Sequence, residues 1–371
     1  MRLTLKNLHH FLLGKGLIDA KSLVSGDYMV SQIQTRNSIF RVARKKAKGL
    51  FIKQLNNFDQ NNTYVLQKDA TCLWLIKNEP AFRALNKYVP EYFGYDTEHQ
   101  VLITEYLSDA KSLEYVVQSA GELPAHFIDQ LAQMMASYQF NLSEKVKSLR
   151  SVQFFPKQVP WVLNLMDMPA QTFQQMTNSS NPNPVFSLVA NNEGFRKLVG
   201  PIKENWKTTS LIHGDIKWMN ILVASPNDKP KLKLIDWEIA DIGDPLWDIA
   251  GIFAAIITTL VLKKQQQNPN AAFAPYQVSS LADLQEAWPT IIRFWNQYLK
   301  KRKARQEPAE QALKKTIDYT GVRLIQSAVE QNMMQPQIQP NATMILQASY
   351  LVLEKAAEIF NQLTEQKTVK S

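Results

Sequence analysis

Two short apolar segments of this chain each carry an acidic residue that a folded protein could use in chemistry. The first, Leu211 to Val223, contains Asp215 and, five positions later, Asn220, and the second ends near Asp236. Mg²⁺ bound to a nucleotide prefers octahedral oxygen ligands and takes only one or two of them from the protein. The amide of Asn220 and the carboxylate of Asp236 are ligands of that kind. The spacing therefore predicts a site for Mg²⁺ and a nucleotide phosphate.

Phosphoryl transfer also needs a carboxylate that binds no metal, holds the acceptor hydroxyl in line and accepts its proton late. We assign this role to Asp215. A general base typically contributes ~10²–10⁴-fold in rate, so Asp215 is expected to matter far more than a surface charge. The alternative is that each aspartate only forms a turn, as Asp beside Gly or Pro often does. The joint spacing of Asp215, Asn220 and Asp236 favours the chemical interpretation.

These segments resemble the catalytic, metal-binding and following loops of the aminoglycoside phosphotransferase family, which has a protein-kinase-like fold. The resembling stretches are His213 to Asn220, Ile235-Asp236-Trp237-Glu238 and Gly243 to Ala250. The resemblance implies that Asp215 is the catalytic base and that Asn220 and Asp236 hold the metal. It also implies that Asp248 supports the catalytic loop from the next helix.

Lys217 departs from the commonest pattern of the family, in which a histidine often stands two residues after the base. It is similar to the lysine of protein kinases that neutralises charge near the γ-phosphate. We therefore include Lys217 with Asp215 among the expected catalytic residues.

The N-terminal part is expected to contain a hairpin that covers the nucleotide. Tyr28 to Ile33 and Ser38 to Ala43 are rich in β-branched and aromatic residues, which predicts two strands. A third strand, Gly49 to Gln54, carries Lys53, which by the resemblance holds the α- and β-phosphates. Leu75 to Leu85 matches the glutamate-bearing helix of the family. In that helix Glu79 would pair with Lys53, although an ordinary strand-end lysine and a solvated glutamate are the alternatives.

The turn that covers the phosphates lacks a glycine-rich motif. No Gly-x-Gly-x-x-Gly occurs, and Gly14-Lys15-Gly16 lacks the spaced glycine and the following Ser or Thr of a P-loop. The turn must therefore use Arg36, Asn37 and Ser38, through backbone N–H groups or side chains. The forked donors of Arg36 suit a phosphate, and a plain exposed turn arginine is the alternative.

The strand Val101 to Leu107 leads into the linker, where the backbone of a kinase meets the adenine ring. Glu105, Tyr106 and Leu107 are expected to supply N–H and C=O contacts to the base. Because the backbone would make these contacts, the side chains do not distinguish ATP from GTP.

Length and composition suit a two-domain α+β protein. A chain of 371 residues with 45% hydrophobic residues can fill two cores. We expect a small antiparallel-sheet N-lobe over residues 1–107 and a larger, mostly helical C-lobe over 108–371. Pro124 to Phe140 and Ile345 to Leu363 show the apolar spacing of helices. The polar stretch Gln171 to Asn192 is expected to be a loop.

Cysteine content and hydropathy favour a soluble cytoplasmic protein. Cys72 is the single cysteine, so no intramolecular disulfide can form. The first ten residues lack the apolar region of a secretory signal. The longest apolar stretch, Ile249 to Leu262, is shorter than the about 20 residues that span a bilayer. It is expected to form the buried helix behind Asp248.

The net charge of +9 bears on the acceptor. Basic runs such as Arg44 to Lys48 are usually solvated, although an anionic partner is the sharper alternative, and no nucleic-acid motif is present. Polycationic aminoglycosides are best held in acidic clefts, whereas Asp241 to Ser371 has no acidic cluster. A neutral or anionic hydroxylated acceptor is therefore favoured.

Three functions remain open from the sequence. The first is transfer of the γ-phosphoryl group of Mg-ATP or Mg-GTP to the hydroxyl of a small molecule. The second is a kinase of Ser or Thr in a precursor peptide, as in lanthipeptide-type maturation, acting with a partner protein; Leu8 to Leu17, Arg36-Asn37 and Lys53-Gln54 look like such enzymes. The third is a pseudokinase that only binds nucleotide. The sequence does not fix the acceptor, the nucleotide or the oligomeric state.

Overall fold

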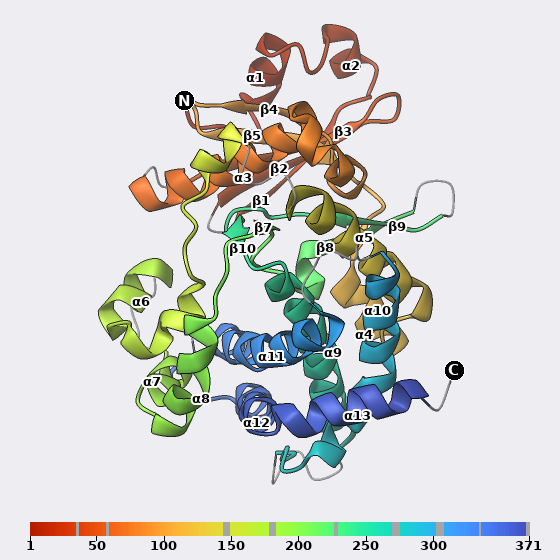
Figure 1. Cartoon of the computed structure of the whole chain (residues 1–371). Helices are drawn as coiled ribbons and strands as arrows, with labels where there is room; N and C mark the ends of the chain where they lie inside the picture. Colours follow the sequence, from red (N-terminus) through yellow and green to blue (C-terminus); the bar gives the residue numbers. More distant parts are fainter. Residues whose placement is uncertain are drawn as a thin grey trace. The chain divides into compact units, whose positions relative to one another are not determined.

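The computed structural model describes residues 1–34, 37–56, 59–143, 149–177, 183–225, 229–268, 275–301, 308–333 and 335–368. The chain divides into two compact units (Figure 1). The first comprises Met1–Leu113 and Met219–Ala240, and the second comprises Glu114–Trp218 and Asp241–Ser371. The boundary expected after residue 107 did not include the return of residues 219–240 to the first unit.

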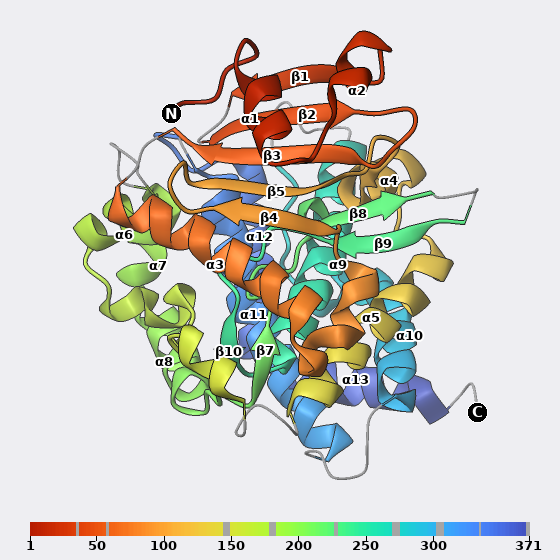
Figure 2. The ribbon, with the colours of Figure 1, turned by 90° about the horizontal axis from the view of Figure 1, so that it is seen from above.

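The first unit contains a five-stranded antiparallel sheet in the order β1-β2-β3-β5-β4 (Figure 2). Its strands are β1 (Met29–Gln34), β2 (Asn37–Ala43), β3 (Gly49–Leu55), β4 (Tyr92–Asp96) and β5 (Val101–Tyr106). The predicted hairpin and third strand are therefore present. Side chains of a strand alternate between the two faces of the sheet, so β2, β3 and β5 each contribute to two different environments.

One face of this sheet forms a hydrophobic core with the N-terminal helices α1 (Leu8–Gly14) and α2 (Ala20–Val24). Phe40, Val42 and Ile52 lie on this face and are fully buried. Their neighbours in sequence Arg41, Phe51 and Lys53 lie on the opposite face, where they line a cavity. Because strand side chains alternate, the side chains of the second face stay out of this core and can line a binding site.

Helix α3 (Gln60–Asn78) follows β3 and leads into the 3₁₀ helix η1 (Pro80–Tyr88). The expected helix from Leu75 to Leu85 is wrong in its bounds because α3 ends at Asn78. Glu79 has an extended backbone, as the residue before a proline commonly does, since the ring of Pro80 disfavours a helical conformation there.

A second sheet in the first unit joins β6 (Lys111–Ser112), β8 (Ile221–Ala224) and β9 (Lys231–Leu234). The start of β8 pairs with the end of β9, because Ile221 lies opposite Leu234. Just beyond this pair, the N–H of Ile235 donates to the carbonyl of Asn220 at 3.0 Å. The hairpin therefore brings the segments that carry Asn220 and Asp236 side by side.

The second unit is mostly helical. Its helices are α4 (Leu113–Ala120), α5 (Ala125–Ser143), α6 (Ala170–Thr177), α7 (Pro184–Ala190), α8 (Glu193–Glu204), α9 (Leu246–Gln267), α10 (Trp288–Lys300), α11 (Ala309–Gln331), α12 (Pro340–Glu354) and α13 (Ala356–Thr368). Short 3₁₀ helices cover Arg150–Phe154, Trp161–Asp167, Leu281–Asp283 and Gln285–Ala287, and a further one, Trp218–Asn220, crosses from the second unit into the first along the chain. A two-stranded sheet pairs β7 (Ser210–Ile212) with β10 (Asp241–Gly243).

Two expectations for this unit need correction. The stretch Gln171 to Asn192 contains α6 and α7 as well as loop, and α7 begins with Asn183, whose side chain accepts hydrogen bonds from the N–H groups of Val185 and Phe186. The single helix expected from Ile345 to Leu363 is two helices, α12 and α13, separated at Lys355. The apolar pattern continues across the break, so periodicity does not reveal it.

Helix α9 is the buried helix expected behind Asp248. By length and hydropathy it is the one helix among the described residues that could cross a bilayer, yet 67% of its most apolar window is buried inside the protein, which is the pattern of a core helix. It packs against α11, which also packs against α12. A Cβ atom at Gly251 would lie 2.8 Å from the carbonyl oxygen of Ile216, so α9 approaches the segment after Asp215 closely.

Asp318 of α11 provides a pH-dependent stability prediction. Burial raises the pKa of its carboxyl to about 6, so the folded state binds a proton more tightly than the unfolded state does. Above pH 6 the buried carboxylate is charged and destabilises the fold, so Asp318→Asn is expected to raise the free energy of unfolding by about 1–3 kcal/mol. Below pH 4 the carboxyl is protonated in both states, and the substitution is expected to leave the free energy of unfolding unchanged. Urea unfolding at pH 8, 6 and 4 measures this difference. An equal effect at all three pH values would contradict it.

Candidate active site

The polar face of the large sheet forms one wall of a cavity in the first unit. The cavity has a volume of about 470 Å³ and includes Arg41, Phe51, Lys53, Tyr106 and Asp236 in its lining. Arg41 lies opposite Phe51 on neighbouring strands, and the same alternation that buries Phe40 turns both toward the cavity. Small-molecule and cofactor sites typically have volumes of ~300–1,000 Å³, so the cavity is large enough for a nucleotide.

Lys53 lies among three carboxylates of the first unit. Its Nζ atom is 3.0 Å from Asp236 Oδ1, 3.3 Å from Glu238 Oε2 and 3.5 Å from Asp69 Oδ2. Burial by itself lowers the pKa of Lys53, but the three carboxylates outweigh burial and raise this pKa well above its usual value. Lys53 is therefore a permanent cation, surrounded by an excess of negative charge.

The helix carboxylate that faces Lys53 is Asp69 and not Glu79. Asp69 projects from the middle of α3 and is 4% exposed; its Oδ1 also accepts the N–H of Trp237 at 3.3 Å. Glu79 lies ten residues further along, where α3 has ended. Burial raises the pKa of Asp69 to about 6, with Lys53 opposing the increase. The expected pairing of Glu79 with Lys53 is therefore wrong. Lys53 pairs with Asp69 instead, and both residues line the cavity.

The expected phosphate-covering turn is partly described. Arg36 lies outside the described residues. Asn37 lines the cavity. Ser38 is buried and its Oγ donates to Asn56 Oδ1 at 2.6 Å, so its hydroxyl serves the strand packing. Of the two expected residues that the structure describes, Asn37 is the one in the cavity lining.

Glu105, Tyr106 and Leu107 all line the cavity, as expected for a linker that meets a nucleobase. The N–H of Glu105 donates to the carbonyl of Glu91 at 2.8 Å, and its carboxylate lies 3.2 Å from Lys48 Nζ. The amide hydrogen of Glu105 is therefore occupied.

Asp236 combines an exposed carboxylate with an unusual backbone. Its φ of +68° lies in the left-handed region, which aspartate tolerates better than most residues because its short polar side chain can hydrogen-bond locally. The following residue, Trp237, is completely buried, while the Asp236 side chain remains 37% exposed. The backbone therefore turns sharply between a cavity-facing carboxylate and a core tryptophan.

The donor set fits a hard divalent cation. Asn220 and Asp236 offer an amide and a carboxylate oxygen from adjacent segments of one hairpin, and Mg²⁺ needs only one or two such ligands beside a nucleotide. Among the described residues no group of three His, Cys, Asp or Glu side chains forms a metal cluster. Two protein ligands would leave the remaining positions of such a cation to water and phosphate oxygens.

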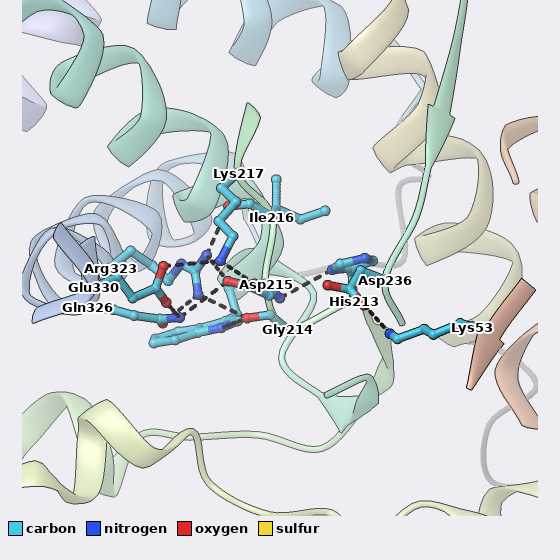
Figure 3. Close-up of polar contacts among 11 residues, drawn as sticks. Lys53, His213, Gly214, Asp215, Ile216, Lys217, Asp236, Arg323, Gln326 and Glu330 are labelled. Atoms are coloured by element: carbon cyan, nitrogen blue, oxygen red, sulfur yellow. Dashed lines mark hydrogen bonds and ion pairs between the residues drawn. The ribbon is translucent and has the colours of Figure 1, made fainter. Parts of the chain in front are cut away.

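Asp215 lies in the second unit, in the loop between β7 and the short 3₁₀ helix at Trp218. Lys217 Nζ is 2.7 Å from Asp215 Oδ2 (Figure 3). Burial alone would raise the pKa of Asp215, but the cations of Lys217 and Arg323 outweigh it and hold the pKa below its usual range. Asp215 is consequently ionised at neutral pH, which a proton acceptor requires.

Asp248 anchors this loop from the first turn of α9. Its Oδ2 accepts the N–H of His213 at 2.8 Å and the hydroxyl of Tyr138 at 2.7 Å, and its Oδ1 accepts the N–H of Gly214 at 3.0 Å. The carboxylate is 1% exposed. Asp248 thus supports the loop that carries Asp215.

Asp248→Asn is expected to lower the free energy of unfolding by about 1–3 kcal/mol, because an amide cannot accept at both positions and leaves a buried donor unpaired. Thermal or urea unfolding measures the loss. Tyr138→Phe is the matched control, since it removes one hydrogen bond and leaves the loop N–H groups paired. Equal losses for the two variants would contradict an anchoring role for the carboxylate.

Several residues at these two places were not expected from the sequence. They are Asp69 and Glu238 around Lys53, and Arg323, Gln326 and Glu330 of α11 around Asp215 and Lys217. Glu238 was part of the resembling stretch without an assigned role. Asp69 and the α11 residues lie in helices that carry no local motif, so only folding brings them to the site.

The chain is similar to known proteins both in sequence family and in fold. A family model described as the phosphotransferase enzyme family (APH) matches residues 77–277. No curated protein matches the chain significantly. Similar solved structures include an ethanolamine kinase from Plasmodium vivax, with a TM-score of 0.57, 15% sequence identity and coverage of 97% of this chain and 91% of that chain.

Two further structures show the same fold similarity. A choline kinase from Cryptosporidium parvum Iowa II has a TM-score of 0.53 and 16% identity, covering 97% of this chain and 95% of that chain. An amicoumacin kinase in complex with AMP-PNP, Ca²⁺ and its ligand has a TM-score of 0.51 and 11% identity, covering 96% of this chain and 99% of that chain.

The expected protein-kinase-like α+β fold and the expected phosphotransferase class are therefore confirmed. The family match includes Asp215, Asn220, Asp236 and Asp248 and begins after Lys53. Because this match spans more than half of the 371 residues, the chain belongs to the phosphotransferase enzyme family.

Proposed function

We propose that the protein transfers the γ-phosphoryl group of Mg-ATP to a hydroxyl group of a small molecule. The observation that carries this proposal is the Lys53–Asp236 ion pair in the lining of a nucleotide-sized cavity. The family match supports it, because it includes Asp236 and Asp215. The structures similar in fold include enzymes described as kinases of ethanolamine, choline and amicoumacin, which supports a small acceptor.

The roles we propose follow from charge and geometry. Lys53 holds the α- and β-phosphates, exchanging part of its contact with Asp69, Asp236 and Glu238 for phosphate oxygens. Asn220 and Asp236 hold a divalent cation, Mg²⁺ in our proposal, which neutralises charge that develops on the transferred group. A cation held by Asp236 would also offset the carboxylate excess around Lys53.

Asp215 is the proposed proton acceptor. The acceptor hydroxyl donates its hydrogen bond to the Asp215 carboxylate, which receives the proton as the new O–P bond forms and the bond to the leaving nucleotide breaks. A carboxylate whose pKa is held low remains ionised until the hydroxyl oxygen loses electron density. Lys217, beside Asp215, is placed to balance that negative charge.

A direct assay tests the proposal. The purified protein is incubated with Mg-ATP or Mg-GTP and a panel of hydroxylated amines, sugars, antibiotics and Ser/Thr peptides, and new phosphate esters are detected by ³¹P NMR and mass spectrometry. A phosphorylated small molecule formed at least ten times faster than nucleotide hydrolysis is the expected result. Phosphopeptide formation alone would replace it with the peptide kinase. Nucleotide binding without transfer to any acceptor or to water would identify a pseudokinase.

A further inference from the structure

Helix α11 brings three polar side chains to the loop that carries Asp215. Arg323, Gln326 and Glu330 are spaced three and four residues apart, which places them on one face of the helix (Figure 3). They lie more than one hundred residues after Asp215 in sequence. All of their contacts described below lie within the second unit, so they form one continuous arrangement with the loop.

Arg323 fixes the backbone on both sides of Asp215. Its guanidinium donates to the carbonyl of Gly214 and to the carbonyl of Ile216, each at 2.9 Å, and its side chain is 5% exposed. The guanidinium also lies over the Trp247 ring, 5.3 Å from the centroid. Two carbonyl groups flanking one residue are thus held by one rigid fork, which fixes the position of the Asp215 Cα atom.

Gln326, Glu330 and Lys217 complete a closed ring with Asp215. Gln326 Nε2 donates to Asp215 Oδ1 at 3.3 Å and to Glu330 Oε1 at 2.8 Å. Lys217 Nζ donates to Glu330 Oε2 at 3.1 Å and lies 2.7 Å from Asp215 Oδ2. Each member of the ring contacts two others. Arg323 also donates to Gln326 Oε1 at 2.6 Å, which fixes the amide orientation.

The ring separates the two oxygens of Asp215. Oδ1 is held by Gln326, which is buried and also bonded to Arg323 and Glu330, whereas Oδ2 is held by Lys217. Lys217 already has a second carboxylate, Glu330, and is 36% exposed. Lys217 can therefore move away from Asp215 and still keep Glu330 as an ionic partner. Oδ2 can then receive the acceptor hydroxyl while Gln326 keeps the carboxylate from rotating.

We propose that Gln326 and Glu330 are positioning residues of the phosphotransfer reaction: Gln326 sets the orientation of the Asp215 carboxylate, and Glu330 holds Lys217 when Asp215 binds the acceptor hydroxyl. The proposal rests on the proposed function of Asp215, and it adds two residues that act through Asp215 and Lys217. Its tests include a measurement that does not depend on turnover.

The first test measures the chemical reactivity of the Lys217 amine. The charged groups that face Lys217 are Asp215 on its own loop and Glu330 on α11, with Arg323 beyond Asp215, 3.7 Å from its Oδ1. Glu330→Gln removes one anion and keeps a similar shape. Competitive acetylation at pH 9, followed by mass spectrometry of the Lys217 peptide, is expected to show labelling about threefold faster or more, which corresponds to half a pKa unit. Glu330→Asp is expected to retain slow labelling.

The second test measures turnover with the acceptor found in the panel, or with water as acceptor. Glu330→Gln and Gln326→Leu are expected to lower kcat by about tenfold to a hundredfold, because small misplacements of a catalytic group are costly. KM for the nucleotide is expected to change less than threefold. Glu330→Asp is expected to recover part of the loss, which a purely structural role would not require.

Matched controls lie on the same helix. Glu310→Gln and Gln311→Leu alter the same residue types at exposed positions of α11 and are expected to leave both labelling and kcat at the wild-type values. Unchanged Lys217 labelling in Glu330→Gln would overturn the proposed role of Glu330. An unchanged kcat in Gln326→Leu would overturn that of Gln326. If no acceptor is phosphorylated at all, the proposed function fails while the labelling result still decides the Lys217–Glu330 contact.

Discussion

Asp215→Asn is expected to lower the rate of phosphoryl transfer by about 10²–10⁴-fold or more, which is the usual contribution of a general base. The amide keeps the shape of the side chain but cannot accept the hydroxyl proton. Affinity for Mg-nucleotide is expected to stay within about threefold of wild type, since the roles proposed for nucleotide binding belong to Lys53, Asn220 and Asp236. Initial rates of product formation and calorimetric binding of a non-hydrolysable nucleotide measure the two quantities.

The neighbourhood of Asp215 provides the control for this experiment. Replacing Asp215 by Asn also removes an anion from Lys217, so a loss of folding must be separated from a loss of chemistry by comparing thermal unfolding curves. Asp318→Asn, which changes the same residue type within the same unit, is the control variant for turnover. A variant Asp215→Asn that retains more than one tenth of wild-type turnover would remove Asp215 from the proposed mechanism.

Asp236→Asn is expected to reduce kcat/KM by about 10²–10³-fold, since a catalytic metal supplies several kcal/mol of transition-state stabilisation and ~1.4 kcal/mol is tenfold in rate. The variant should also need a higher Mg²⁺ concentration for half-maximal activity, because an amide is a weaker ligand than a carboxylate. A Mg²⁺ titration at saturating nucleotide measures this shift.

Glu238→Gln is the matched variant for Asp236→Asn. Both carboxylates contact Lys53 Nζ, at 3.3 Å and 3.0 Å, so both substitutions remove one anion from the same lysine. Only Asp236 has a proposed role as metal ligand. A similar Mg²⁺ dependence in the two variants would mean that Asp236 acts through Lys53 alone.

Local patterns predicted the parts of the site that lie close together in sequence. Asp215 and Asn220 are separated by one short loop, and Asp236 follows a strand that pairs with the strand after Asn220. In such segments a few consecutive residues determine how the side chains lie relative to one another. Their spacing in the sequence was therefore enough to predict a phosphoryl-transfer site. The hairpin and the strand that carries Lys53 were predicted for the same reason.

Contacts between distant segments were not predictable in this way. Choosing Asp69 over Glu79 requires the end point of α3 and the direction in which its residues face, which depend on packing against the sheet. Likewise, Gln326 and Glu330 are ordinary polar residues of a long helix until the fold brings them to Asp215. The break between α12 and α13 was not predictable from periodicity, because the apolar pattern continues through it.

The first unit is assembled from two stretches of chain, with residues 114–218 inserted between them. During synthesis on a ribosome, Lys53 and Asp69 emerge long before Asp236 and Glu238, so two of the three acidic partners of Lys53 become available only after residue 238 has been translated. Long-range closure of this kind slows folding relative to local contacts. An N-terminal fragment ending at residue 113 would therefore contain the five-stranded sheet and lack the β8–β9 hairpin, which is the proposed metal site. Activity from two co-expressed halves would require the C-terminal half to donate that hairpin.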